Sequence, residues 1–163
     1  MTEAQVRAIA VFFYYVLPHE LLAMEATDKA IKELKAKKKK SEEIFEVLLI
    51  KTCNKIARKK RKEYLSESKD LAQHNFPKAY DKIKEPLIKP STLSVAAWRQ
   101  ILRDEGHESL YLLVWAHVLE FPIDYIVLAS ECSHGTVMHR LSQSLNLLGS
   151  YLQPGGQSWG TNA

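Results

Sequence analysis

The stretch from Glu120 to Gly149 reads EFPIDYIVLASECSHGTVMHRLSQSLNLLG, and it decides the fold that the sequence predicts. Apolar residues recur at helical spacing over residues 123–130 and again over residues 134–151. Only residues 131–133 separate the two runs. A short helix, a three-residue turn and a longer helix form the outline of a helix-turn-helix. We expect the Ser133 hydroxyl to cap the second helix.

Upstream of this stretch, two further helices are predicted over residues 92–103 and 107–120, and Gly106 separates them. Residues 66–91 do not show the helical periodicity of these segments. Prolines and charges are scattered there instead. Such a composition is typical of a linker. The C-terminal residues, PGGQSWGTNA, predict a flexible tail over 153–163.

The first part of the chain predicts three helices. The first covers residues 4–17, and the second starts with Pro18 in its first turn and ends in the lysine run 37–40, which we expect to be a solvated turn. The third starts at Ser41, where a capping oxygen precedes two acids, and reaches about Tyr64. We expect the following residues of the second, third and last helices to face inward: Leu21, Leu22, Ala26, Ala30, Leu34, Phe45, Leu48, Leu49, Thr52, Cys53, Ile56, Val137, Leu141, Leu145 and Leu148.

These patterns predict an all-α protein of two small helical units, residues 1–65 and 92–152, joined by the linker 66–91 and followed by the tail. A chain of 163 residues with 46% hydrophobic and 26% charged residues is ordinary for a globular protein. It is long enough to bury one substantial core or two small ones.

The cysteines and the longest apolar run indicate a cytoplasmic protein without a membrane segment. Cys53 and Cys132 lie far apart and show no CxxC spacing, so neither a disulfide framework nor a zinc site is indicated. The run from Ala8 to Leu17 is about half of the ~20 residues that a membrane-spanning helix needs. We expect no cofactor.

The stretch from Glu120 to Gly149 resembles region 4 of the extracytoplasmic-function sigma factors of bacterial RNA polymerase. In that family a helix-turn-helix ends in a GTVKSRL-like sequence, and Gly135-Thr136-Val137 and Arg140-Leu141 stand at the matching places. The N-terminal half is similar to region 2 of the same family. EATDKAIKEL, from Glu25, resembles its QEAFLRAWRAL helix, and LIKTCNKIARKKRKE, from Leu49, resembles its IARNLAIDRLRRR helix.

The resemblance implies a transcription factor that binds RNA polymerase core and promoter DNA, with no chemistry of its own. Region 2 would contact the polymerase through Glu25, Lys29 and Lys32. Region 4 would read the upstream promoter element through the outward face of its last helix. That face holds Thr136, His139, Arg140 and Gln143, which follow helical spacing.

A second candidate contact with nucleic acid is a cluster of cations in the N-terminal unit. The alternative interpretation is a solvated helix end that the helix dipole favours. The cluster consists of Lys55, Arg58, Lys59, Lys60, Arg61 and Lys62.

The uneven distribution of charge along the chain distinguishes a DNA-binding sigma factor from a protein that only resembles one. Residues 1–65 hold 15 Lys and Arg against nine Asp and Glu, whereas residues 107–163 hold Arg140 against four acids. Where the family has lysine or arginine, this chain has Met138 and Gln143. Because phosphate contacts supply most non-specific DNA affinity, a second hypothesis is a sigma mimic that captures an anti-sigma factor or another protein. An unrelated helical bundle is the third interpretation.

Signals for catalysis or metal binding are weak. The sequence contains no GxSxG, P-loop, GxGxxG or HExxH motif. His134 and His139 are five residues apart, which places them off a common helix face and disfavours a metal site with Cys132. We therefore expect no enzyme and no small-molecule substrate.

Overall fold

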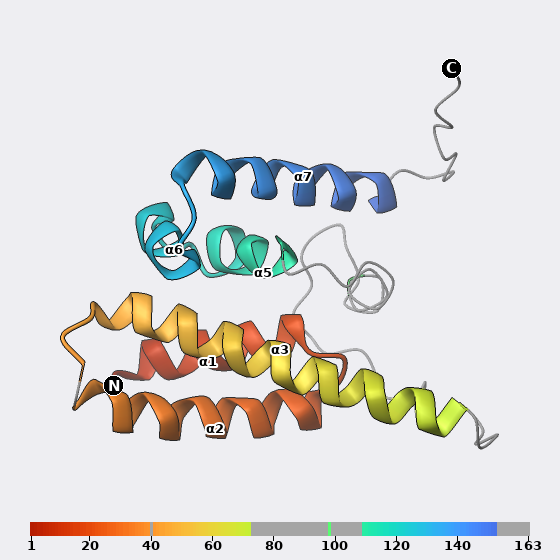
Figure 1. Cartoon of the computed structure of the whole chain (residues 1–163), viewed down its shortest axis with the longest axis horizontal. Coiled ribbons are helices and arrows are strands. Elements are labelled where there is room, and N and C mark those ends of the chain that lie inside the picture. The colour runs from red at the N-terminus through yellow and green to blue at the C-terminus, as the bar shows by residue number, and fades with distance from the viewer. Residues whose placement is uncertain (40, 73–97, 99–108, 153–163) are drawn as a thin grey trace.

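The computed structural model describes residues 1–39, 41–72, 98 and 109–152 (Figure 1). Within these ranges the chain forms six α-helices and one π-helical segment and no strand, as the predicted all-α class requires. The elements are α1 (Glu3–Val16), α2 (Glu20–Lys38), α3 (Phe45–Ala72), α5 (Ser109–Leu113), η1 (Val114–Val118), α6 (Ile123–Ser130) and α7 (His134–Leu152).

Helices α1, α6 and α7 confirm the predicted segments to within one residue at each end. Helix α1 begins with a reciprocal cap. The Thr2 hydroxyl accepts a hydrogen bond from the Gln5 backbone N–H at 3.3 Å, and the Thr2 N–H donates to the Gln5 side chain at 2.9 Å. This arrangement satisfies two donors that the first helical turn leaves open.

The predicted starts of the second and third helices are wrong by a few residues. Helix α2 begins at Glu20, and Nδ1 of His19 accepts the Leu22 N–H at 3.4 Å. Helix α3 begins at Phe45 rather than at Ser41. The Ser41 hydroxyl accepts the Glu43 N–H at 3.1 Å, so it closes a local turn instead of capping the helix.

The predicted linker also starts too early, because α3 continues to Ala72. The polar sequence SESKD at residues 66–70 contains neither glycine nor proline. Extending a formed helix costs much less than starting one, so these residues continue α3. The remainder of the predicted linker, the helix over 92–103 apart from Trp98, and the tail 153–163 lie outside the described residues.

The helix predicted over 107–120 is described from Ser109 and widens into a π-helix at Val114. The Leu119 N–H donates to the Val114 carbonyl, and the Phe121 N–H donates to the Trp115 carbonyl, both at 2.9 Å. Such wide turns are rare in proteins. The segment then leaves the helix, and Glu120 takes a φ of 53°.

The two units pack against each other. Helices α1, α2 and α3 contact one another, and α5, η1, α6 and α7 form the second group. Helix α6 packs on α3, and η1 packs on α1. Figure 1 shows α5 and α6 between α7 on one side and the first three helices on the other. One continuous core therefore joins the two predicted units.

Two indole groups tie the C-terminal part of the chain to the first three helices. Nε1 of Trp98 donates to the Tyr15 carbonyl at 2.6 Å, and Nε1 of Trp115 donates to Oδ1 of Asn54 at 2.9 Å. Both tryptophans are buried. A buried indole N–H needs a partner, and here each partner comes from the other unit.

The predicted inward face is wrong at two leucines. Leu21 is 66% exposed and Leu145 is 45% exposed. On α2 the buried stripe begins at Ala23 and continues through Ala26, Ala30 and Leu34. None of the described helices is long and apolar enough to cross a membrane.

Candidate nucleic-acid interface

Four of the six clustered cations on α3 form one exposed stripe. Lys55, Arg58, Lys59 and Lys62 lie at positions i, i+3, i+4 and i+7, and all four are exposed. Residues at this spacing are neighbours on a helix surface. The stripe extends over about 10 Å of helix axis at 1.5 Å per residue. We call these four residues the α3 stripe.

The other two cations of the cluster lie off the stripe. Arg61 is half-buried, and Lys60 turns toward α2. The Lys60 ammonium lies 2.8 Å from Oε2 of Glu25 and 3.9 Å from a Glu63 oxygen. The hydrogen bond and the charge of Lys60 hold the pKa of Glu25 below its ordinary value of 4.5. Lys60 thus joins α2 to α3. Within the α3 stripe, the Lys59 ammonium also lies 3.9 Å from a Glu63 oxygen, in an exposed ion pair.

The turn between α6 and α7 has the geometry that the sequence predicts. The Ser133 hydroxyl accepts the Thr136 N–H at 3.1 Å, which confirms the predicted cap of α7. The Thr136 hydroxyl lies 2.9 Å from the Ser133 hydroxyl. Before the turn, Glu131 ends α6 with a left-handed φ of 54°. A backbone of this kind at a helix C-terminus usually carries glycine or asparagine.

A lysine of α3 holds this turn in place. The Lys51 ammonium lies 2.8 Å from Oε1 of Glu43 and 3.2 Å from Oε1 of Glu131. Hydrogen bonds to Glu43 and Glu131 raise the pKa of Lys51. The turn between α6 and α7 is thereby connected to the start of α3.

The predicted reading face of α7 is exposed over most of its surface but holds little positive charge. His139, Arg140 and Gln143 are exposed, and Thr136 is half-buried. Nη1 of Arg140 lies 3.7 Å from Sγ of Cys132, in the turn. Val137 and Leu141 lie behind this face in the core, as predicted, and Leu148 is half-buried.

The residues predicted to contact polymerase lie on α2. Glu25 is bound to Lys60, Lys29 is half-buried, and Lys32 is exposed at the edge of a pocket near the end of the helix. The structure brings Glu25 together with the α3 cluster, a contact that the resemblance does not imply. Lys32 instead lines a pocket together with Lys38 and Lys39.

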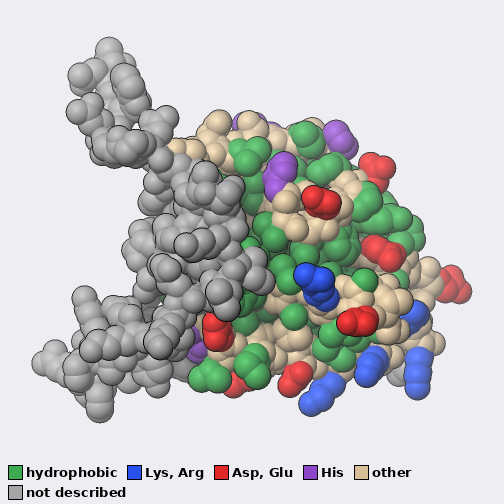
Figure 2. Space-filling view, turned by 180° about the vertical axis from the view of Figure 1, so that it is seen from behind, with side chains coloured by type: hydrophobic (Ala, Val, Ile, Leu, Met, Phe, Trp, Pro, Cys, Tyr) green, Lys and Arg blue, Asp and Glu red, His purple; other side chains and the backbone are tan. Residues whose placement is uncertain are grey.

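The α3 stripe and the α7 face do not meet in one surface. Helix α6 contacts both α3 and α7, and Figure 1 shows α7 and α3 on opposite sides of the α5 and α6 layer. Figure 2 shows most of the visible Lys and Arg side chains along the lower edge, on the side of the molecule formed by α1, α2 and α3. Residues 109–152 hold a single Lys or Arg, Arg140, so positive charge in the described part of the chain is concentrated on the first three helices.

Sequence reasoning missed how the lysine run before residue 40 is used. Lys38 and Lys39 line a pocket together with residues from the starts of α1 and α3, where the sequence predicts only a solvated turn. The clustering of these lysines in the sequence was the one signal that could have indicated the pocket. Sequence reasoning also missed the split of the α3 cluster, which helical spacing alone would have revealed.

Among the described residues, no group of three His, Cys, Asp or Glu side chains is placed to hold a metal ion. Cys53 is buried, and burial raises the pKa of its thiol. No family model, curated protein or solved structure matches the chain.

Proposed function

We propose that this chain is a transcription regulator of the sigma-factor type, which binds nucleic acid through the α3 stripe and RNA polymerase core through α2. The observation that carries the proposal is the stripe itself. Four exposed cations within about two helical turns are opposite in sign to a phosphate backbone, which carries one negative charge per about 1.7 Å of duplex axis.

The capped turn between α6 and α7 supports the same function. A short helix, a three-residue turn and a longer helix that begins at a side-chain cap form the arrangement in which the second helix enters a major groove. On that helix Arg140 is the cation available for a base edge. Both cysteines are free thiols, which fits a protein that works in the cytoplasm.

The decisive experiment compares two variants of equal charge. The first neutralises the stripe with Lys55→Gln, Arg58→Gln, Lys59→Gln and Lys62→Gln. The second removes four cations from the end of α2 with Lys35→Gln, Lys37→Gln, Lys38→Gln and Lys39→Gln, and keeps Lys29 and Lys32, the expected polymerase contacts. Each protein is mixed with bacterial core polymerase and a fluorescent duplex of promoter length, and binding is measured by anisotropy at several salt concentrations.

We expect the stripe variant to lose most of its affinity for the duplex. The slope of its salt dependence should flatten by up to about 0.9 for each phosphate that the variant no longer neutralises. The α2 variant should keep a steeper slope than the stripe variant. If the salt dependence had the same slope in both variants, the loss of affinity would follow from net charge alone. That result would refute a local contact between α3 and the duplex.

A second candidate function is a sigma mimic that binds a protein partner through α6 and α7. The observation that favours it is exposed apolar surface on the unit that holds a single described cation, Arg140. Met138 and Leu145 are each 45% exposed and lie seven residues apart on one face of α7, and Leu128 of α6 is 53% exposed. Protein interfaces obtain most of their energy from a few such anchors.

Arg140→Ala and the double variant Leu128→Ser, Met138→Ser separate the two functions. In a sigma factor, Arg140→Ala should cost about 1 to 3 kcal/mol of discrimination at the upstream element if it contacts a guanine. In a mimic, promoter selectivity should not change. The serine variant should then abolish capture of a purified anti-sigma factor.

A further inference from the structure

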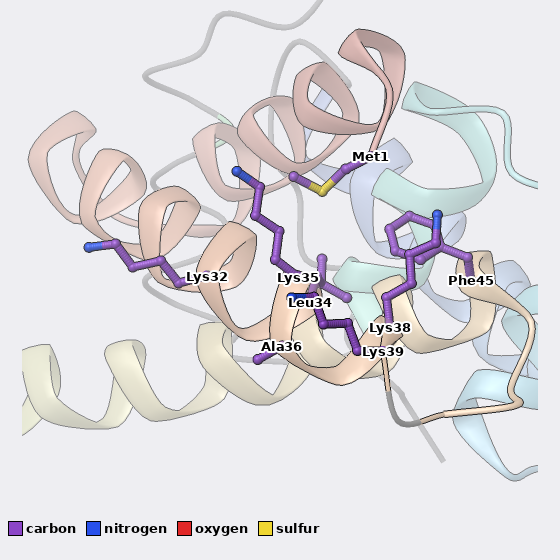
Figure 3. Close-up of a pocket in the computed structure, with 8 residues that line it drawn as sticks. All are labelled: Met1, Lys32, Leu34, Lys35, Ala36, Lys38, Lys39 and Phe45. Atoms are coloured by element: carbon purple, nitrogen blue, oxygen red, sulfur yellow. The ribbon is translucent and has the colours of Figure 1, made fainter.

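A pocket of about 700 Å³ lies where the end of α2 meets the starts of α1 and α3 (Figure 3). Its volume falls in the usual range of small-molecule sites, ~300–1,000 Å³. It shares no residue with the α3 stripe or with the α7 reading face. The described residues that line it include Met1, Lys32, Lys35, Lys38, Lys39 and Phe45.

The pocket combines an apolar surface with a cationic rim. Leu34 is fully buried, and Met1 and Phe45 pack against the core. Figure 3 shows the Lys35 and Lys38 side chains on either side of Met1. The Lys38 ammonium lies 4.9 Å from the centre of the Phe45 ring, so it is held at the edge of the apolar surface.

The four rim lysines are not neutralised by described carboxylates. None of Lys32, Lys35, Lys38 and Lys39 takes part in an ion pair there, whereas Lys37, on another face of α2, lies 3.5 Å from Glu33. Lysines that repel one another around an apolar hollow attract an anion. Each ammonium presents three donors to it.

The side chains of the lining also indicate the chemistry of the uncharged part of the ligand. Among the described residues of the lining, the lysine ammoniums are the only polar side-chain groups, and none of these residues carries a hydroxyl, amide or carboxylate. A nucleotide base or a sugar would lose hydrogen bonds to water there without replacing them. An aliphatic chain has no hydrogen bonds to water to lose, and its transfer out of water is favourable.

We propose that this pocket binds a single-chain amphiphilic anion, an aliphatic chain that ends in a carboxylate or a phosphate. The chain lies against Met1 and Phe45, with the buried Leu34 beneath them, and the head group is held by Lys35 and Lys38. The inference uses neither the α3 stripe nor the α7 face. Of the predicted polymerase contacts on α2 it shares Lys32 alone, and Lys35 and Lys38, which hold the head group, are not among them.

The test is calorimetric titration of the full chain with dodecanoate and with dodecyl phosphate, both kept below their micelle concentrations. Both should bind, and a neutral dodecyl maltoside and inorganic phosphate should bind at least about ten times more weakly. Affinity should rise from hexanoate to dodecanoate by up to about fourfold per methylene, the equivalent of ~0.8 kcal/mol. Binding without any gain with chain length would overturn the proposal.

Three variants locate the binding. Lys35→Gln with Lys38→Gln should weaken dodecanoate binding at least about tenfold, while Lys55→Gln with Lys59→Gln, an equal loss of charge on α3, should leave it within about twofold. Ala36→Phe, at an exposed position of α2, should narrow the pocket and weaken the longer chains most. Circular dichroism checks that each variant is folded.

Three results would refute the site. The first is unchanged affinity in the Lys35 and Lys38 variant. The second is equal binding of inorganic phosphate and dodecyl phosphate, because the apolar surface would then have no role. The third is binding to phosphatidylglycerol vesicles without binding to monomeric dodecanoate, which would make the lysines a membrane contact instead.

Discussion

The ring of Phe12 in α1 stacks on the indole of Trp115 in η1, with centroids 4.3 Å apart and planes inclined by 17°. Both side chains are fully buried. The contact joins residues that are far apart in the sequence and belong to the two predicted units. The first three helices and the last four elements are therefore expected to unfold together.

Hydrogen exchange tests this shared core. The slowest amides of α1 and of η1 should exchange with the same free energy, because one cooperative unfolding exposes both. Trp115→Ala should lower that free energy by about 3 to 5 kcal/mol in both places. Exchange of α5, α6 and α7 at a clearly lower free energy than α1 would show two independent units.

The cap of α7 predicts the effect of a small substitution. Ser133→Ala removes the acceptor of the Thr136 N–H and should lower the free energy of unfolding by about 1 kcal/mol. Ser133→Asp keeps an acceptor and should restore most of the loss. The control is Ser142→Ala at an exposed position of the same helix, which should change little. Urea denaturation measures all three.

Glu131 occupies a backbone conformation that suits glycine. Its φ of 54° costs a residue with a Cβ about 1 to 2 kcal/mol, and its exposed ion pair with Lys51 contributes less. Glu131→Gly should therefore raise the free energy of unfolding by about 1 kcal/mol. Glu131→Ala removes the same ion pair but keeps the Cβ. Thermal denaturation in which the glycine variant is no more stable than the alanine variant would contradict this account.

Lys60 holds the pKa of Glu25 below its ordinary value. The carboxylate therefore favours the folded state at pH above 4.5, and this contribution disappears as the pH falls through the lowered pKa. Carbon-detected NMR titration should show the pKa of Glu25 rising toward 4.5 in Lys60→Gln. Lys62→Gln, on the α3 stripe, should not move it. An unchanged pKa in Lys60→Gln would exclude the ion pair in solution.

The two cysteines should differ in reactivity. Cys53 is fully buried and its thiol pKa is raised, so it holds little of the reactive thiolate. Cys132 is half-buried, in the turn beside Arg140. A disulfide reagent at pH 8 should modify one thiol in the folded protein and both in denaturant. Fast modification of the folded Cys132→Ser variant would show that Cys53 is accessible.

Much of the helical framework, and one detail of the candidate interface, could be predicted from sequence. Apolar periodicity located α1, α6 and α7, and Ser133 could be named as a cap, because a helix and its cap depend on residues within about four positions of one another. Helical spacing contained the α3 stripe as well. The errors at Ser41 and at residue 66 are boundary errors, where a local turn and continued helix propagation outweighed the expected signals.

The sequence by itself therefore determined which segments are helical, where α7 is capped and which part of the chain carries the positive charge. The tertiary structure alone decided that Lys60 binds Glu25, that Trp115 meets Asn54 and that Leu21 remains exposed. It also placed Met1, the end of α2 and Phe45 around one pocket. Periodicity states which side of a helix is apolar, but the neighbour that covers that side is chosen by packing between distant residues, which no local pattern encodes.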